Sequence, residues 1–223
     1  MTKIIASIRP KNFEDGEDLI LSAQIAGAEM IEIWCDKMDL ADLKKLVIIS
    51  ELPVMVNLKD KSEKGLFTGT MFERIKFLEA LINEGAAYLD LPFSEELSAV
   101  DLDRFKGKLV ISAHDFEQTP SLDEIENLIG KILKLNPAIL KLAFKVNKEI
   151  DLVNLFQLQV SRRELWGKSV ILGMGQKGAI TRVMSKMFQH PFTFASIDRF
   201  SRTAPGQMTI EQLNKIWRKF GFK

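Results

Sequence analysis

The sequence is poor in the residues that build disulfides and metal centres. Its 223 residues include one cysteine, Cys35, and two histidines, His114 and His190. A single cysteine excludes an intrachain disulfide and a cysteine-based zinc site. Two histidines on separate segments, without a third ligand in a recognisable motif, do not predict a metal centre either. We therefore expect no bound metal.

The chain also lacks an excess of charge and a long apolar run. Its formal net charge is +1, so we expect no nucleic-acid surface. The apolar runs are far shorter than the roughly 20 residues that span a bilayer. The opening segment turns polar after six residues, which argues against a secretory signal or a transit peptide. These absences favour a soluble cytoplasmic protein without a membrane partner.

What the sequence does contain is a regular alternation of two patterns. Longer amphipathic stretches separate eight short apolar or β-branched runs, at 3–8, 30–34, 53–58, 87–91, 108–114, 138–144, 169–174 and 192–197. Near-continuous hydrophobicity is typical of parallel strands that are covered on both faces. No linker rich in glycine, serine or proline divides the chain. Eight strand–helix units predict an α/β fold, a single-domain (β/α)8 TIM barrel over residues 1–223, with a doubly wound sheet as the alternative.

A glycine pattern in the segment 169–184 raises a different possibility. Gly173, Gly175 and Gly178 have the spacing G-x-G-x-x-G, and Asp198 follows twenty residues later. This is the spacing of a dinucleotide-binding loop with its ribose-binding acid. Such a loop belongs after the first strand of a nucleotide-binding unit, however, and here it follows the seventh. The pattern therefore favours a glycine-rich loop at the end of a strand over an NAD site.

In a barrel, catalytic residues stand at the C-terminal ends of the strands. Lys141 lies within the predicted strand 138–144 and has apolar neighbours on both sides. Burial there predicts a lowered pKa and a larger fraction of neutral amine. A neutral amine can attack a carbonyl group to form a Schiff base. The alternative is a lysine that reaches solvent or pairs with an acid.

Further candidates stand at the same predicted end of the barrel. His114 ends the preceding strand and suits proton transfer near neutral pH, with Glu63 as the acid that orients it. His190 precedes a proline in a probable loop and has no evident partner. Arg182 and Gln207 offer donors for a carboxylate. Each also has a simpler interpretation, as a locally hydrogen-bonded histidine or a solvated surface residue.

Several segments resemble one known family. SAHDFEQTPSLDEI, AILKLAF, GMGQKGAITR, TAPGQMTIEQL and LPVMVNLKDKSEKGLF are similar, in the same order, to motifs of type I 3-dehydroquinate dehydratase. The resemblance extends from Ile4 to Phe220. It implies a (β/α)8 barrel without cofactor or metal, a homodimer, and an enzyme of the shikimate pathway that acts on a small molecule, 3-dehydroquinate.

The resemblance also implies roles for particular residues. Lys141 forms an imine with the C3 ketone, His114 removes a C2 proton and protonates the departing C1 hydroxyl, and Glu63 holds His114. The remaining expected contacts are the substrate carboxylate with Arg182, Thr203 and Gln207, the ring hydroxyls with Glu32 and Lys59, and the pocket wall with Ser7. The glycine loop presents Met174 and Arg182 at the barrel mouth.

The chain departs from the family pattern at four positions, and one of these changes, Thr203 in place of a serine, keeps the hydroxyl. Trp34 replaces the arginine of the second-strand motif E-x-R-x-D, Lys59 replaces the arginine after the third strand, and Pro92 replaces the acid that ends the strand-four motif D-x-E. Otherwise we expect Trp34 and Phe144 to be packing residues. These departures leave two alternatives open. One is an aldolase-like Schiff-base barrel for a different hydroxy-ketone, and the other is a non-enzymatic barrel that binds a carboxylate.

Overall fold

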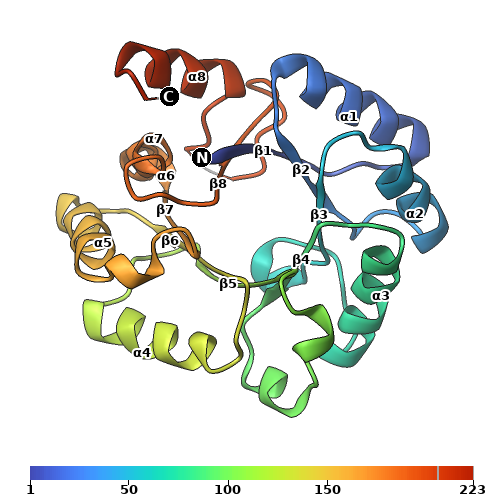
Figure 1. Ribbon diagram of the computed structural model, residues 1–223, viewed down its shortest axis with the longest axis horizontal. Coiled ribbons are helices and arrows are strands. Elements are labelled where there is room, and N and C mark those ends of the chain that lie inside the picture. The colour runs from blue at the N-terminus through green and yellow to red at the C-terminus, as the bar shows by residue number, and fades with distance from the viewer. Residues whose placement is uncertain (205, 223) are drawn as a thin grey trace.

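The computed structural model describes residues 1–204 and 206–222; Pro205, in the TAPGQ motif, lies outside them. The described residues form a ring of strands with helices around it (Figure 1). The strands are β1 (Lys3–Ile8), β2 (Met30–Trp34), β3 (Val54–Asn57), β4 (Tyr88–Pro92), β5 (Leu109–Asp115), β6 (Ile139–Lys145), β7 (Ser169–Met174) and β8 (Phe192–Ala195). All eight predicted strands are present, and their ends differ from the predictions by two residues at most.

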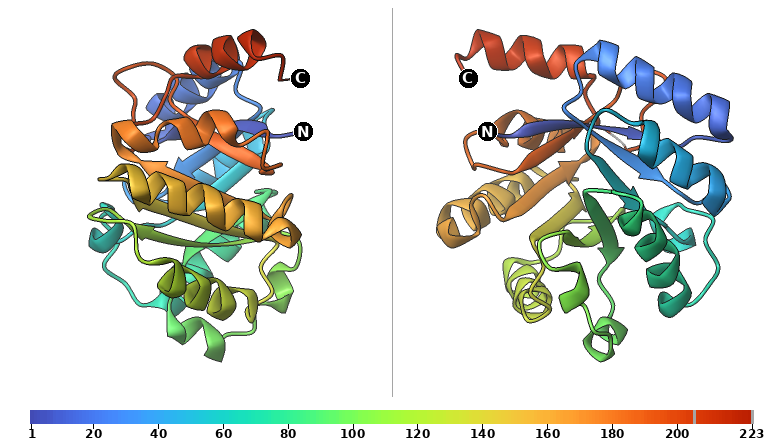
Figure 2. Two further views of the ribbon diagram at one scale, coloured as in Figure 1. Left: turned by 90° about the vertical axis from the view of Figure 1, so that its left-hand side faces the viewer. Right: turned by 45° about the vertical axis from the view of Figure 1, so that its right-hand side comes forward.

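The helices follow the strands along the chain and lie around the ring of strands, as Figure 1 and the right-hand view of Figure 2 show. They are α1 (Phe13–Ala26), α2 (Leu40–Ile49), α3 (Met71–Asn83), α4 (Leu122–Leu133), α5 (Glu149–Ser161), α6 (Gly175–Gly178), α7 (Ile180–Met184) and α8 (Ile210–Lys219). Short 3₁₀ turns are η1 (Lys61–Glu63), η2 (Glu95–Ala99), η3 (Asp103–Phe105) and η4 (Arg163–Leu165). The helix α4 begins after a capping box formed by Ser121 and Glu124. No helix among the described residues is long and apolar enough to cross a bilayer.

The sheet closes almost completely on itself. Its strand order is β7-β6-β5-β4-β3-β2-β1-β8, and every ladder is parallel. The pairing of β1 with both β2 and β8 brings the two ends of the chain together in one ring. This arrangement confirms the predicted (β/α)8 barrel, and it rules out the doubly wound sheet.

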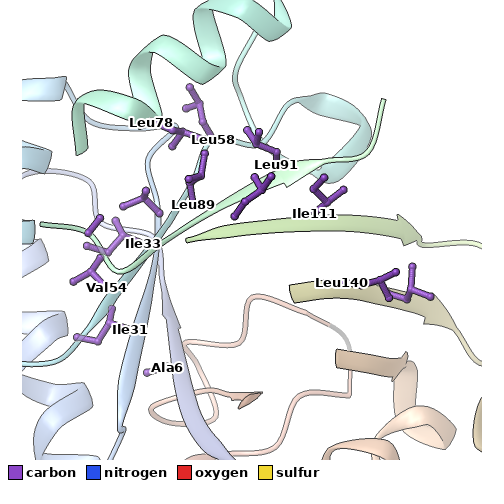
Figure 3. Packing of buried hydrophobic residues seen from close by; sticks show 14 of the residues in the cluster. Ala6, Ile31, Ile33, Val54, Leu58, Leu78, Leu89, Leu91, Ile111 and Leu140 are labelled. Carbon is purple, nitrogen blue, oxygen red and sulfur yellow. The ribbon is translucent and has the colours of Figure 1, made fainter. Parts of the chain in front are cut away.

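The outward faces of the strands form the larger part of the core. Because side chains alternate along a strand, every second residue points toward the helices. Figure 3 shows part of this layer, where Leu89 and Leu91 of β4 lie on the side that faces Leu78 of α3. Phe144 belongs to the same buried cluster, so its predicted packing role is confirmed. This layer attaches the helices to the barrel.

The inward faces change character along the barrel axis. Near the N-terminal ends of the strands a second apolar cluster fills the interior, with Ile5, Met30, Met55, Val110, Ile139, Val170, Leu172, Phe192 and Phe194. Two residues further along six of the strands, the inward positions are polar and buried: Ser7, Glu32, Asn57, Asp90, Ser112 and Lys141. The apolar cluster thus forms a floor, and the polar layer above it lies toward the C-terminal end of the barrel.

The glycine pattern after β7 has a packing explanation. A Cβ atom on Gly178 would lie 2.4 Å from the carbonyl carbon of Gly173, so both positions need glycine where α6 meets the strand. Gly175 has a φ of +83°, which favours glycine. Asp198 is exposed, and its carboxylate accepts hydrogen bonds from the backbone of Phe200 and Ser201. The spacing therefore follows from close packing and a local turn, without a nucleotide.

Candidate active site

A cavity opens at the C-terminal ends of the strands, above the polar layer. Of the sequence-predicted site residues, eight line it: Ser7, Glu32, Lys59, His114, Lys141, Arg182, Thr203 and Gln207. Glu63 stands behind His114 and touches its ring. The other lining residues are Trp34, Phe116, Ala143, Leu172, Met174, Phe194 and Ala204. The fold thus brings together all nine residues that the sequence singled out.

Lys141 stands on the inner face of β6 between two buried acids. Its Nζ donates to Asp90 Oδ2 at 2.7 Å and to Glu32 Oε1 at 3.2 Å. Burial alone would lower the pKa of Lys141, but the two carboxylates raise it above its ordinary value. Burial alone would likewise raise the pKa of Asp90 and Glu32, and the lysine ammonium lowers both. The predicted fall in the pKa of Lys141 is therefore wrong, because the acids on β4 and β2 outweigh desolvation.

Asp90 is the site residue that sequence reasoning missed. It is the first residue of the strand-four motif D-x-E, whose third position is Pro92 in this chain. Because the acid of that third position is missing, the sequence analysis did not select Asp90. Its carboxylate is buried and paired with Lys141. Strand alternation carries a signal that points to it, because Asp90 follows the inward-facing Tyr88 by two residues. An acid at an inward position of a parallel barrel strand needs a partner inside the barrel.

His114 ends β5, next to β6. Its Nδ1 lies 2.6 Å from Glu63 Oε1. Because an ionised carboxylate only accepts hydrogen bonds, Nδ1 carries the proton and Nε2 keeps a free lone pair. Burial lowers the pKa of His114 and Lys59 acts in the same direction, while Glu63 opposes them. The neutral imidazole is therefore the resting form, with one nitrogen oriented and the other available as a base.

Glu63 reaches His114 from η1, the 3₁₀ turn after β3. Burial would raise its pKa, but Lys59 and the hydrogen bond to His114 lower it to about 2. Lys59 Nζ donates to Glu63 Oε2 at 3.3 Å. The ring of Phe116 stacks against His114, with centroids 5.9 Å apart and planes at 10°. These contacts keep Glu63 charged and the His114 ring in one orientation.

Arg182 is a buried cation without a counter-charge among the described residues. It lies on α7, where one guanidinium nitrogen donates to the Gly173 carbonyl at 2.9 Å and Nε has no hydrogen-bond partner among the described residues. Burial without an acid lowers the pKa of Arg182 to about 10. Beside it, Gln207 Oε1 accepts from the Thr203 backbone at 2.9 Å, which leaves the amide NH₂ of Gln207 without a described partner. A buried cation next to free donors suits an anionic ligand.

His190 lies at the other end of the barrel, before β8, and takes no part in this cavity. Its Nε2 is 2.7 Å from Gln159 Oε1 and its Nδ1 is 3.2 Å from Ser185 Oγ. Burial lowers its pKa to about 3. The expectation that it has no partner is therefore wrong, since it forms a neutral hydrogen-bonded pair on each side. In the part of the chain that the structure describes, no group of three or more His, Cys, Asp or Glu side chains could hold a metal ion.

The position of the cavity matches that of active sites in barrel enzymes, which lie at the carboxyl ends of the strands. Its contents suit a small anion with a carbonyl group, since Lys141 can add to a carbonyl carbon and Arg182 can hold a negative charge. Fold and cavity together define a (β/α)8-barrel enzyme.

Comparison with known proteins identifies the family. The model of type I 3-dehydroquinase matches residues 4–221, so the chain belongs to the type I 3-dehydroquinase family. A 3-dehydroquinate dehydratase from Methanocaldococcus jannaschii is 30% identical over 202 residues, 88% of this chain and 89% of the relative. One from Methanococcus maripaludis strain C5 is 29% identical over 91% of this chain and 94% of the relative. The resemblance that the sequence motifs indicated is confirmed.

Solved structures agree on the fold. The crystal structure of 3-dehydroquinate dehydratase from Geobacillus kaustophilus superimposes with a TM-score of 0.87 at 20% identity. The match covers 99% of this chain and 91% of that one.

Proposed function

We propose that this protein is a 3-dehydroquinate dehydratase, a hydro-lyase of the shikimate pathway that works through a Schiff base on Lys141. The observation that carries this proposal is that one cavity is lined by Lys141, by His114 and by Arg182, whose guanidinium has no acid partner among the described residues. The family and the names of the relatives supply the substrate. The product is 3-dehydroshikimate, and one water molecule is released.

The charges in the cavity orient the substrate. Its carboxylate, on ring carbon C1, lies against Arg182, Thr203 and Gln207. There the Arg182 guanidinium and the Gln207 amide NH₂, neither paired with an acid among the described residues, can bind an anion. Its ketone at C3 then reaches Lys141. The ring hydroxyls at C4 and C5 lie on the side away from the carboxylate, where Glu32 and Lys59 line the cavity.

Asp90 and Glu32, the two acids beside Lys141, take part in forming the Schiff base. The lysine loses a proton before its nitrogen attacks C3, and Asp90, at 2.7 Å, is the nearest base. Loss of the carbonyl oxygen as water then gives a protonated imine, which carries the positive charge that the ammonium carried before. Asp90 and Glu32 stabilise this cation by the same Coulomb attraction that raises the pKa of Lys141.

The protonated imine draws electrons from the neighbouring carbon and makes the C2 proton acidic. The free Nε2 of His114 accepts that proton, and the electron pair of the C–H bond forms an enamine. The enamine then expels the C1 hydroxyl, to which His114 returns the proton, so that water leaves. Addition of water to the product imine releases 3-dehydroshikimate and restores Lys141.

Three further expectations stay predictions: a homodimer, a cytoplasmic location, and a reaction that needs neither metal nor cofactor. The homodimer follows from the family resemblance alone. Sedimentation of the purified chain measures its mass directly, and assay after exhaustive chelation and dialysis measures the requirement for a dissociable group.

Borohydride trapping tests the proposed function. Reduction during turnover of 3-dehydroquinate is expected to leave a substrate-sized mass on the peptide that contains Lys141, in the parent and in K145M. Lys145 is the matched control, because it ends the same strand and does not line the cavity. K141M is expected to give no adduct and no rise in enone absorbance. The proposal fails if the parent shows neither adduct nor product. An adduct with another hydroxy-ketone alone would favour the aldolase-like alternative.

A further inference from the structure

Trp34 forms part of the cavity wall at the end of β2, and its indole N–H is already hydrogen-bonded within the protein. Trp34 ends β2 and lines the cavity, with only 8% of its surface exposed. Its single donor, Nε1, is used by Glu32 Oε2 at 3.2 Å. The same Glu32 oxygen also accepts from Ser7 Oγ at 2.7 Å. Trp34 therefore presents a ring surface to the cavity, and its N–H is already engaged.

The Arg9 side chain lies against Trp34 and does not line the active cavity. The Arg9 guanidinium carbon lies 5.1 Å from the centre of the Trp34 ring, and Lys59 Nζ lies 5.7 Å from it. Arg9 is committed to Asp36 through Nε, at 3.0 Å, and through a second nitrogen. It lines the adjoining hollow, which shares Trp34 as a wall, and it does not line the active cavity. Both cations thus lie against the indole, and Arg9 stays outside the active cavity.

The arrangement of strands places Trp34 and His114 on different sides of the cavity. His114 ends β5 and Trp34 ends β2, three positions apart in the eight-stranded ring. In 3-dehydroquinate the ring atom opposite C2 is C5. With C2 at His114, C3 at Lys141 and the carboxylate at Arg182, the C5 hydroxyl points toward the β2 side. The C4 hydroxyl, next to the imine carbon, lies nearer to Lys59 and to Glu32, the β2 acid that pairs with Lys141.

We propose that Trp34 sets the substrate specificity of this site, giving the C5 side of the ring an apolar wall so that the enzyme accepts anionic cyclic ketones without a hydroxyl there. This inference rests on the proposed function. The family pattern has an arginine at this position, and a guanidinium there would be left without a partner by a substrate that lacks the C5 hydroxyl. An indole whose N–H is already bonded to Glu32 avoids that cost.

The expected selectivity follows from whether the site donates to that hydroxyl. A site built to hydrogen-bond a hydroxyl rejects the analogue that lacks it by about 10⁴-fold or more, whereas an apolar wall discriminates by only about 10²-fold. We therefore expect kcat/KM for 3-dehydroquinate to exceed that for its 5-deoxy analogue by less than about 10²-fold.

The test compares two variants of similar size. W34Q and W34L both remove the indole and open similar space, but only glutamine carries an N–H donor. Arginine is a poorer choice, since it would stand beside Arg9 and Lys59 and be repelled. We expect the ratio of kcat/KM between the two substrates to be similar in W34L and the parent, and roughly tenfold higher in W34Q, as for one hydrogen bond of about 1.4 kcal/mol.

A parent ratio above the expected limit, or equal ratios in W34Q and W34L, would overturn the inference. The parent measurement decides it alone if either variant fails to fold. Borohydride trapping separates this failure from that of the proposed function. A Lys141 adduct with 3-dehydroquinate and a steep parent ratio would leave the function standing and remove the role of Trp34. No adduct with either ketone would remove both.

Discussion

Replacing Glu63 by glutamine tests the pair that positions the proposed base. Glutamine keeps the shape of the side chain and an oxygen that accepts from His114 Nδ1, but it removes the charge. In the structure this contact is 2.6 Å long, and the His114 and Glu63 side chains are only 9% and 8% exposed. Solvent screening is therefore weak, and the loss of charge acts at nearly full strength.

The size of the effect follows from the hydrogen bond. A bond to a charged group contributes about 1.5–3 kcal/mol, and one between neutral groups about 0.5–1.5. The difference, about 1–1.5 kcal/mol, corresponds to about one pKa unit. Glu63 raises the pKa of His114 while burial and Lys59 lower it. In E63Q, burial and Lys59 act unopposed, so the pKa of His114 falls further below its ordinary value.

The pH dependence of dehydration reports this shift. We expect the acid limb of kcat/KM in E63Q to move to lower pH by about one unit. The plateau is expected to fall by roughly 10–10³-fold, because a weaker and less firmly held base transfers the proton more slowly. E51Q, an exposed change far from the cavity, is the control. Because the chain has two histidines, NMR titration of the imidazoles also measures the shift directly. An acid limb that moves upward, or a plateau equal to that of the parent, would refute the reasoning.

Three other predictions follow from buried polar and charged groups. R182M removes a buried cation that lacks a counter-charge among the described residues, so we expect the urea midpoint to stay the same or rise. We also expect KM to rise about 10²-fold, because about 3 kcal/mol of contacts with the substrate carboxylate are lost. A lower midpoint with an unchanged KM would contradict this. H190A leaves Gln159 Oε1 without its partner. We expect the free energy of unfolding to fall by about 2–4 kcal/mol and kcat to stay unchanged. Lost activity in a stably folded H190A variant would contradict this prediction. The depressed pKa of Glu63, about 2 against 4.5, stabilises the fold fully above pH 4.5 and progressively less toward pH 2. The lowered pKa of Asp90 acts in the same direction. Urea titrations at pH 5 and pH 3 measure that loss, and equal stabilities would refute it.

The strand pattern and the positions after each strand could be predicted because they depend on local sequence. Parallel barrel strands are apolar on both faces, so eight such runs are visible without knowledge of their order in space. The rule that function collects at one end of a barrel then selected His114 and Lys141, and the cavity contains both. The same reasoning offered Glu63, Arg182 and Gln207, and the match to family motifs supplied Ser7, Glu32, Lys59 and Thr203.

The electrostatics of Lys141 could not be predicted in this way. Its partners Asp90 and Glu32 are 51 and 109 residues away in the sequence. Within its own strand the lysine has only apolar neighbours, which suggested a lowered pKa. His190 misled for the same reason, since Gln159 is 31 residues away. Coulomb interactions depend on distance in space, and they reversed the sign that local burial implied.

Local sequence determined the eight strand–helix units and the residue types available for chemistry, because alternation and capping act over a few residues. Closure of the barrel decided which of those residues meet. It set Asp90 and Glu32 against Lys141, left Arg182 without an acid in the part of the chain that the structure describes, and placed Trp34 in the cavity wall. The physical reason is that ion pairing, burial and cavity walls arise between strands, whose order and register exist only in the folded chain.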